Sequence, residues 1–251
     1  MSQATAPLIA LEGIGKTYGA VTALMGIDLA LQAGEVLAIC GDNGAGKSSL
    51  IKIMSGAEEP TSGVMRLRGE SQRFRSPHDA LTKGVATIYQ DLALAPRLSI
   101  AQNVFMGAEL TRGIGFLKFL DKGRMAREAK GYLARLSVQI DDMARPVERL
   151  SGGQRQAVAI SRALRWNADI IIMDEPTAAL GVKETGQVLE LIRRLAAEGR
   201  TVVLISHSMR DVAALATRIV ILKGGRKIID MPNQGLTGDA IGHMIMEAPA
   251  A

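Results

Sequence analysis

The first third of the chain alternates short apolar runs with polar turns. The runs predict strands at residues 8–12, 27–31, 36–40, 64–67 and 85–88. The run from Val36 to Cys40 is apolar at every position, which predicts a buried strand. A helix is expected from about Gly46 to Ser55, and it ends before a turn at residues 59–63, because this turn contains a proline and a glycine.

Between about residues 91 and 163 the pattern has the period of a helix. The segment 121–136 repeats an apolar residue every three or four positions, with charged residues between them. No long β-branched run interrupts the region. We therefore expect an α-helical lobe inserted into a sheet domain.

Strands and helices alternate in the last third of the chain. Strands are predicted at 170–173, 201–205 and 218–222, and helices at 183–198 and 209–216. This order implies a mainly parallel sheet with helices on its faces. The predicted fold class is therefore α/β, with a parallel sheet core, an N-terminal antiparallel β subdomain and the inserted helical lobe.

Composition restricts the kind of protein. The sequence is 47% hydrophobic but only 3% aromatic, so its core must be aliphatic. The apolar runs have the length of strands, well short of the roughly 18 residues of a membrane-spanning helix. The N-terminus lacks the pattern of a signal peptide, and a single cysteine, Cys40, excludes an internal disulfide framework. We expect a cytoplasmic protein in which Cys40 is a small core residue.

The net charge of +5 comes from positive residues that are dispersed and usually have acids nearby. Their densest group is Arg66, Arg68, Arg73 and Arg75, with Phe74 as the only aromatic residue among them. A solvated hairpin is favoured there over a nucleic-acid surface, so no nucleic-acid partner is expected. The charge also leaves open a weak attraction to anionic lipid at a membrane surface.

A glycine-rich loop follows the predicted strand 36–40. It matches the phosphate-binding P-loop pattern at every fixed position, through Gly41, Asp42, Asn43, Gly44, Ala45, Gly46, Lys47 and Ser48. Glycines let backbone N–H groups surround phosphate oxygens, and the start of a helix adds positive potential. We expect residues 41–49, Ser49 included, to bind a nucleoside triphosphate. An ordinary glycine-rich turn is the disfavoured alternative.

Two acidic residues stand where another apolar strand ends. In P-loop proteins such an aspartate lies beside a Mg²⁺ ion, which predicts this role for Asp174, together with the hydroxyl of Ser48. The adjacent Glu175 is the candidate base for attacking water, and Lys47 is the candidate contact to the β- and γ-phosphates. Without the P-loop, Asp174 and Glu175 would be read as the cap of a helix.

The segment from Leu150 to Gln154 reads Leu-Ser-Gly-Gly-Gln. Together with the P-loop before it and the acidic pair after it, this segment resembles the signature of ATP-binding cassette (ABC) ATPases. The resemblance covers residues 8–229 and implies a P-loop NTPase of ABC type that hydrolyses ATP with Mg²⁺. It also implies a head-to-tail homodimer, in which ATP lies between one subunit's P-loop and the other's signature. The signature residues that would contact ATP are Ser151, Gly152, Gly153 and Gln154.

Three isolated residues gain a role from the resemblance. Tyr18 resembles the aromatic residue that stacks on adenine. Gln90 resembles the glutamine that contacts Mg²⁺ and the γ-phosphate and joins the two lobes, and His207 resembles the switch histidine at the γ-phosphate. On their own these would be read as a packing tyrosine, a loop glutamine and a structural histidine. His78 and His243 match nothing and are read as structural.

The resemblance implies a single ATPase domain that spans residues 1–251. Its parts are expected to be a catalytic core with the β subdomain at 1–90 and 164–234, a helical signature lobe at 91–163, and a C-terminal helix and tail at 235–251. Within the lobe, Phe116 and Phe119 would either face a partner or fill a small core.

The sequence departs from the family pattern at residues 178–181, which read Ala-Ala-Leu-Gly. Cassettes usually have an aspartate at the last of these positions, so its part in communication across the dimer is in doubt. Gly181 is expected to supply backbone freedom at this turn instead. This variant and residues 89–110 resemble ATPase subunits of bacterial simple-sugar importers for fructose, ribose or xylose. A single cassette resembles the fructose-import type.

That subclass implies a transmembrane permease as partner, with a short helix docked around Gln90, and indirectly a periplasmic sugar-binding protein. The ATPase would lie on the cytoplasmic face of the inner membrane. The alternatives are an ABC ATPase of another importer class or a non-transport cassette that acts on ribosomes or DNA. The signature argues against a P-loop kinase or GTPase, and Glu175 argues against an inert ATP-binding protein.

Overall fold

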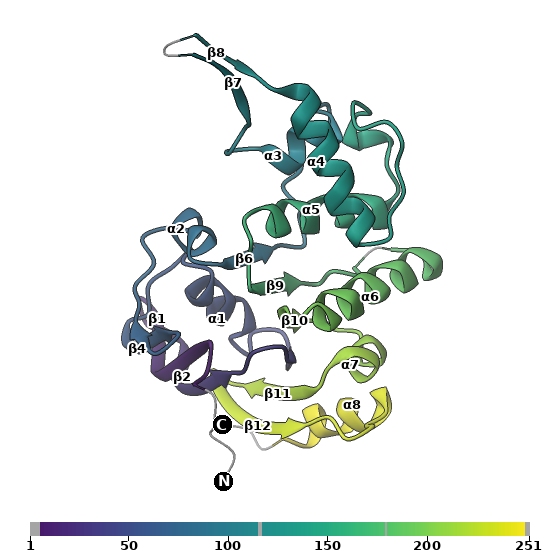
Figure 1. Ribbon diagram of the computed structural model, residues 1–251. Helices are drawn as coiled ribbons and strands as arrows, with labels where there is room; N and C mark the ends of the chain where they lie inside the picture. The colour runs from purple at the N-terminus through teal and green to yellow at the C-terminus, as the bar shows by residue number, and fades with distance from the viewer. Residues whose placement is uncertain (1–5, 115–116, 179, 249–251) are drawn as a thin grey trace.

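A computed structural model describes residues 6–114, 117–178 and 180–248 (Figure 1). Its main sheet has six strands in the order β12-β11-β3-β10-β9-β6. Their bounds are β3 (Val36–Cys40), β6 (Val85–Ile88), β9 (Ile170–Asp174), β10 (Thr201–Ile205), β11 (Arg218–Lys223) and β12 (Arg226–Pro232). All neighbours in this sheet are parallel except β11 and β12, which confirms the mainly parallel core.

A second sheet is antiparallel throughout and has the order β2-β1-β4-β5. Its strands are β1 (Ile9–Tyr18), β2 (Val21–Leu31), β4 (Ser62–Leu67) and β5 (Glu70–Ser71). This confirms the N-terminal β subdomain, although β1 and β2 are longer than their apolar runs. The predicted arginine hairpin is present, and its Arg66 and Arg68 form ion pairs with Glu12 and Asp169.

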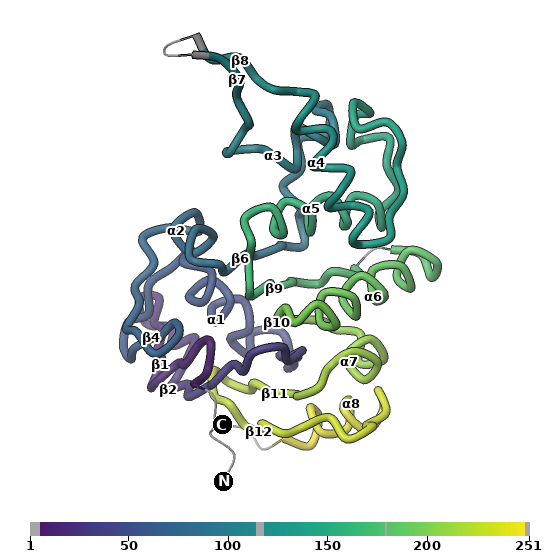
Figure 2. Tube along the Cα trace, in the orientation of Figure 1, coloured from purple at the N-terminus to yellow at the C-terminus, as the bar shows by residue number. Residues whose placement is uncertain are grey.

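Helices cover the main sheet and build a lobe beyond it. They are α1 (Lys47–Met54), α2 (Pro77–Thr82), α3 (Ile100–Phe105), α4 (Lys122–Arg135), α5 (Gly152–Arg165), α6 (Val182–Ala197), α7 (Met209–Leu215) and α8 (Gly238–Glu247), with a 3₁₀ turn at Val147–Arg149. The chain enters the lobe after β6 and returns through α5 to β9 (Figure 2). No helix within the described ranges is long and apolar enough to cross a bilayer.

The lobe shares one aliphatic core with the main sheet. Side chains from α3, α4 and α5 pack with those of α6 and with one face of β9 and β10. The other face of the sheet packs on α1 and on the antiparallel sheet. Because both faces are covered, the apolar strands are fully buried, as Val36–Cys40 was predicted to be.

One part of the lobe differs from the prediction of an all-helical segment. Strands β7 (Thr111–Ile114) and β8 (Leu117–Leu120) form an antiparallel hairpin between α3 and α4. The side chains described in these strands, at 111–113 and 118–120, are all exposed, so they show no buried alternation of the kind that marks a strand in sequence. The side chain of Phe119 is 64% exposed, which contradicts the interpretation that it fills a small core. Phe116 lies outside the described residues.

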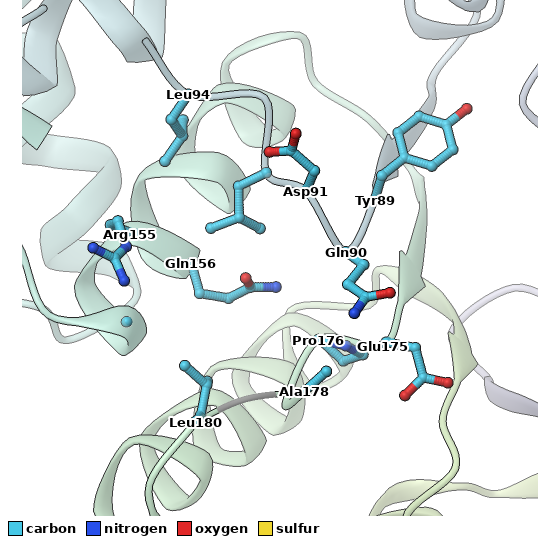
Figure 3. A pocket seen from close by; sticks show the side chains of 12 residues that line it. Tyr89, Gln90, Asp91, Leu94, Arg155, Gln156, Glu175, Pro176, Ala178 and Leu180 are labelled. Atoms are coloured by element: carbon cyan, nitrogen blue, oxygen red, sulfur yellow. The ribbon is translucent and has the colours of Figure 1, made fainter. Parts of the chain in front are cut away.

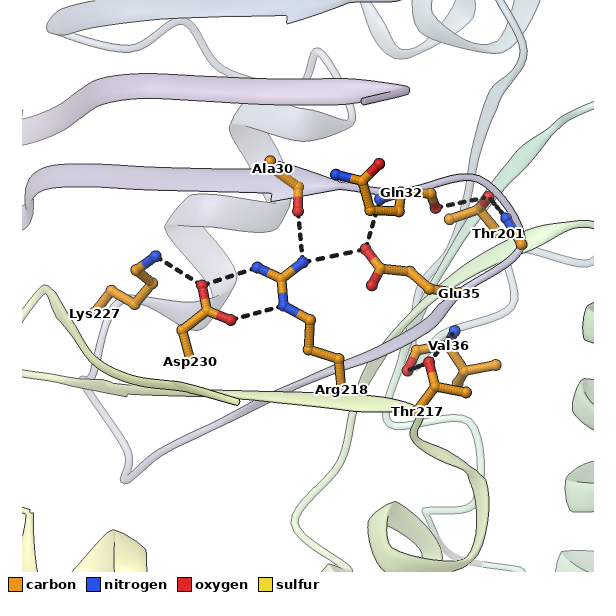
Figure 4. Close-up of polar contacts among 10 residues, drawn as sticks. Ala30, Gln32, Glu35, Val36, Thr201, Thr217, Arg218, Lys227 and Asp230 are labelled. Carbon is orange, nitrogen blue, oxygen red and sulfur yellow. Dashed lines mark hydrogen bonds and ion pairs between the residues drawn. The ribbon is translucent and has the colours of Figure 1, made fainter. Parts of the chain in front are cut away.

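An ionic cluster fixes the edge of the main sheet to the antiparallel sheet. The guanidinium of Arg218 on β11 donates to both carboxylate oxygens of Asp230, at 2.7 and 2.8 Å, and to the carbonyl of Ala30 on β2, at 2.7 Å (Figure 4). Glu35 and Lys227 complete the cluster. A bidentate arginine with a third, main-chain acceptor holds the two sheets in one orientation.

The single cysteine is a core residue, as predicted. Cys40 ends β3 and is completely buried. Burial raises the pKa of its thiol to about 12, so the thiolate that would react with oxidants is suppressed at neutral pH.

Candidate active site

The loop between β3 and α1 has a shape that only glycine permits at two positions. Gly41 and Gly46 have φ angles of 144° and 102°. A Cβ atom would lie 2.2 Å from the carbonyl oxygen of Leu222 at the first position, and 2.7 Å from that of Ala23 at the second. The loop therefore keeps its backbone accessible at the N-terminus of α1, where N–H groups favour anions.

Lys47 is the first residue of α1, and its amine is directed back into the loop. It donates to the carbonyls of Gly41 at 2.7 Å and Asp42 at 2.9 Å. Burial lowers the pKa of Lys47, while the nearby charges of Glu175, Asp42 and Asp174 oppose that shift. A buried ammonium held by two neutral carbonyls is well placed to gain an anionic partner.

The structure brings the predicted metal and catalytic residues and most of the predicted phosphate loop into one pocket of about 430 Å³, whereas Gly41 and Asp42 do not line it. Its lining includes Asn43, Gly44, Ala45, Gly46, Lys47, Ser48, Ser49, Gln90, Asp174, Glu175 and His207. The sheet order explains this convergence: β6, β9 and β10 are adjacent and parallel, so the residues that follow them meet at one edge. Val21, Thr22 and Ala23 of β2 also line the pocket, which no motif had indicated.

Glu175 has an unusual backbone and a defined partner. Its φ angle is 51°, a left-handed conformation that costs a non-glycine residue energy. Its N–H donates to the carbonyl of Ile205 at 2.9 Å. Its carboxylate lies 3.2 Å from Nε2 of His207 and accepts a bond of 3.4 Å from the N–H of the same residue. The strained backbone conformation thus occurs at Glu175, the residue that was predicted to be the catalytic carboxylate.

The pocket offers the oxygen ligands that Mg²⁺ prefers. They are the hydroxyl of Ser48, the carboxylate of Asp174 and the side-chain carbonyl of Gln90. Burial raises the pKa of Asp174, and the charges of Lys47 and His207 act against that shift. A carboxylate that is costly to bury as an anion gains most from a cation, so these residues fit a magnesium ion.

Gln90 also faces a second cavity. A groove of about 300 Å³ lies between the core and the helical lobe, and both Gln90 and Glu175 line it as well as the phosphate pocket (Figure 3). Leu92 and Leu94 follow Gln90 along this groove. Two residues are therefore shared between the candidate phosphate site and a surface between the lobes.

The loop after Gln90 is held by a residue that sequence reasoning missed. Arg162 on α5 donates to the carbonyls of Leu92 at 2.9 Å and Ala93 at 3.1 Å. Burial lowers the pKa of Arg162. No sequence motif marks this contact, because its partners are main-chain carbonyls about 70 residues away.

The signature segment lies at the start of α5 and lines cavities other than the phosphate pocket. Ser151 caps the helix by accepting from the N–H of Gln154, whose side chain accepts from the N–H of Ser151. The N–H of Gly152 already has a partner in this chain, because it donates to Glu184 at 2.9 Å. Gly152 lines the groove, while Gly153 and Gln154 line a cavity beside α6. One chain thus keeps its signature apart from its own P-loop.

Tyr18 lies beyond the residues that line the phosphate pocket. Its ring is partly exposed, and its hydroxyl donates to Glu58, which also pairs with Lys16 and Lys52. The Lys16 ammonium lies 5.1 Å from the centre of the ring. Glu58 therefore orients Tyr18, a role that no sequence signal had suggested.

The expectation for Gly181 was wrong. It is the N-cap of α6 with φ −70° and ψ 165°, a conformation open to any residue, and a Cβ there would meet no atom within 4 Å. Backbone freedom is therefore not the reason for a glycine at this position. Ala179 lies outside the described residues.

Aspartate at position 181 should consequently fit without strain. We expect Gly181→Asp to raise the Hill coefficient of ATP hydrolysis, because a carboxylate is added at the turn before α6, with little change in single-site affinity. The melting temperature should rise slightly, since aspartate is a good N-cap. Gly181→Ser supplies a cap without the charge and is the control. If the Hill coefficient and the rate of the aspartate variant are unchanged, position 181 has no role in communication between the two ATP sites.

Comparison with known proteins agrees with this geometry. The family described as "ABC transporter" matches residues 24–178. The fructose import ATP-binding protein FrcA of Rhizobium meliloti is 46% identical over 95% of this chain and 94% of its own length. The xylose/arabinose import ATP-binding protein XylG of Sulfolobus acidocaldarius is 47% identical over 88% of this chain and 86% of its own.

A solved structure extends the similarity to the fold. A dimeric ATP-binding cassette, described as a post-hydrolysis state with bound ADP and phosphate, superposes with a TM-score of 0.74. It shares 27% identity over 91% of this chain and all of its own. This chain therefore carries its P-loop, its acidic strand end and its signature on the fold of an ATP-binding cassette. The family match spans more than half of the sequence, and this chain belongs to the ABC transporter family as an ATP-binding cassette ATPase.

Proposed function

We propose that this chain hydrolyses ATP in a head-to-tail homodimer and thereby drives a separate permease that imports a simple sugar. One observation carries the proposal: Gln90 and Glu175 line both the phosphate pocket and the groove between the lobes. Chemistry at the phosphates can therefore change the shape of a surface on which another protein docks.

In the proposed reaction, Glu175 accepts a proton from water that attacks the γ-phosphate. Its contact with His207 holds the carboxylate at the pocket and places the histidine beside the same phosphate. Lys47 exchanges its carbonyl partners for the β- and γ-phosphates, where it offsets the charge that develops during transfer. The P-loop N–H groups hold the remaining phosphate oxygens.

Ser48, Asp174 and Gln90 are the residues that would hold Mg²⁺. When bound, the ion would neutralise phosphate charge. The residues themselves fix the position of the phosphates relative to Glu175, since all of them line the same pocket. Tyr18, oriented by Glu58, is proposed as the platform for adenine.

The signature would act on the nucleotide of the partner subunit. In one chain Ser151, Gly153 and Gln154 do not line the phosphate pocket, whereas the hydroxyl of Ser151 is exposed at the start of a helix, where positive potential favours an anion. The similar cassette with ADP and phosphate is described as a dimer, which supports this arrangement. The catalytic core at 1–90 and 164–234 and the signature lobe at 91–163 are the parts we propose to move relative to each other.

The transported substrate is inferred from relatives. FrcA and XylG are import ATP-binding proteins for monosaccharides, and this chain spans 94% and 86% of their respective lengths. We infer a simple sugar, a permease and, upstream of it, a periplasmic binding protein, with this subunit on the cytoplasmic face of the membrane. Uptake of labelled fructose, ribose and xylose by proteoliposomes that contain this chain and a permease that co-purifies with it tests the assignment. Transport of none of them would favour another importer class.

The groove beside Gln90 is the proposed docking site of the permease. We expect Leu92→Glu or Leu94→Glu to abolish assembly with the permease, because a carboxylate at either of these apolar positions of the groove must be desolvated when a partner helix docks. Hydrolysis without the permease should continue, since these side chains do not line the phosphate pocket. Co-purification with tagged permease measures the effect.

Phe119→Glu on the β7–β8 hairpin is the comparison, and it should still assemble. If both groove variants and Phe119→Glu assemble and support uptake, the docking site lies elsewhere. A non-transport cassette would show no co-purifying permease with the wild-type chain either.

A further inference from the structure

The β7–β8 hairpin stands apart from the rest of the fold. Its two strands pair only with each other within the described residues, and they project from the helical lobe away from the main sheet (Figure 1). A two-stranded hairpin is marginally stable in water when nothing covers it. This hairpin therefore has stability to gain from a surface outside the chain.

Its exposed side chains combine apolar groups with positive charge. Phe119 is 64% exposed and Leu120 is 44% exposed, and neither packs on the core of the lobe. Arg112 is the cross-strand neighbour of Phe119, and Lys118 is exposed on the same strand. From residue 111 to residue 120 the sequence contains no acid.

The acids that follow the hairpin are engaged elsewhere. Asp121 caps α4 by accepting from the N–H of Arg124 at 2.9 Å. Glu128 pairs with the side chain of Arg124 at 2.8 Å. In the arginine hairpin of the β subdomain, by contrast, Arg66 forms an ion pair with Glu12 at 2.8 Å. Among the residues that the structure describes, no acid pairs with Arg112 or Lys118, so these charges are left for an anionic partner.

We propose that the β7–β8 hairpin binds the surface of a bilayer that contains anionic lipid. Arg112 and Phe119 share one face of the hairpin, and Lys118 and Leu120 share the other. The hairpin would therefore enter the headgroup region edge-on, so that both cations contact lipid phosphates and both apolar side chains reach the boundary with the acyl chains. This contact rests on the proposed function only in that a permease-bound subunit lies near a membrane. It would align the helical lobe with the bilayer while the groove holds the permease.

The expected strength is modest and depends on salt. A cation near an anionic membrane surface changes the partition coefficient by about fivefold, and loss of two should reduce binding by about 25-fold. The Debye length falls from about 10 Å at 0.1 M salt to about 3 Å at 1 M, so binding should weaken sharply over that range. Loss of the apolar pair should weaken binding without changing this salt dependence.

The test is flotation of the full chain with vesicles made of equal parts phosphatidylcholine and phosphatidylglycerol, and with vesicles of phosphatidylcholine alone. We expect binding to the first and little to the second. Binding to the anionic vesicles should be lost in two double variants. One is Arg112→Gln/Lys118→Gln, and the other is Phe119→Ser/Leu120→Ser. Melting temperature and ATP hydrolysis should be unchanged in both, because the hairpin lies outside the phosphate pocket.

Matched controls separate the hairpin from general charge and general hydrophobicity. Arg73→Gln/Arg226→Gln removes two exposed cations elsewhere, and Met246→Ser removes an exposed apolar side chain of α8. Both should bind vesicles like the wild type. The proposal would be overturned if the Arg73→Gln/Arg226→Gln control lost as much vesicle binding as the hairpin charge variant. It would also be overturned if both hairpin variants bound vesicles like the wild type.

A protein partner for the hairpin gives a different result. If the wild type ignores both kinds of vesicle and the hairpin variants fail to assemble with the permease, the hairpin binds protein and the lipid proposal is wrong. The vesicles contain no permease, sugar or nucleotide, so failure here leaves the proposed transport function untouched. Failure of sugar uptake would likewise not affect vesicle binding.

Discussion

Glutamine in place of Glu175 is expected to slow ATP turnover by about 10²- to 10⁴-fold while ATP binding is retained. The amide keeps the shape of the side chain but cannot accept the proton of attacking water. Because ATP then persists, the ATP-bound dimer should accumulate with Mg-ATP. Size-exclusion chromatography and a phosphate-release assay measure the two effects.

The exposed Glu70 on β5 provides the control for this substitution. Glu70→Gln should hydrolyse ATP like the wild type and return to monomer as ATP is consumed. Near-normal hydrolysis by the Glu175→Gln protein would remove Glu175 from the role of base. His207 would then be the next candidate, since its ring nitrogen lies 3.2 Å from that carboxylate.

Lys47→Ala is expected to weaken ATP binding itself, by about 10- to 100-fold. A hydrogen bond from a charged donor contributes about 1.5–3 kcal/mol, and the alanine variant loses it at the phosphates. The ligand-free protein should fold normally, because burial disfavours the charged amine and its removal takes away that cost. Titration with a fluorescent ATP analogue measures the affinity.

Lys83→Ala, at the C-cap of α2, removes a half-buried ammonium that pairs with Asp79 and does not line the phosphate pocket, and this variant is the control. It should bind ATP with wild-type affinity. If Lys47→Ala binds ATP as tightly as this control, the amine does not contact phosphate, and its bonds to Gly41 and Asp42 are structural.

Sequence patterns predicted most of the parallel core because local and global signals agree there. The strand 36–40 is uniformly apolar and is followed by an obligatory glycine turn, so its bounds were predicted without error. The helix at α4 was found from its apolar spacing to within one residue at each end. Long helices and buried strands carry their periodicity in every residue.

The remaining features depend on contacts that no local pattern encodes. Every hairpin side chain that the structure describes, at 111–113 and 118–120, is exposed, so no buried alternation there distinguishes a strand from a loop. Arg162 and Glu58 act through partners that are distant in sequence or part of the main chain. Gln90 was placed by resemblance alone, and its position between two cavities follows from the pairing of β6 with β9.

The central claim is that one subunit's P-loop and the other's signature form a single ATP site. Ser151→Asp tests the signature, because aspartate still caps α5 but repels the γ-phosphate. Neither this variant nor Lys47→Ala should hydrolyse ATP appreciably by itself, whereas Ser151→Asn, a neutral cap, should retain more activity. The measurement is ATP hydrolysis by an equimolar mixture of the Lys47→Ala and Ser151→Asp proteins. A head-to-tail dimer predicts recovered activity, since the heterodimer contains one site with both an intact P-loop and an intact signature. A mixture as inactive as its components would contradict the shared site.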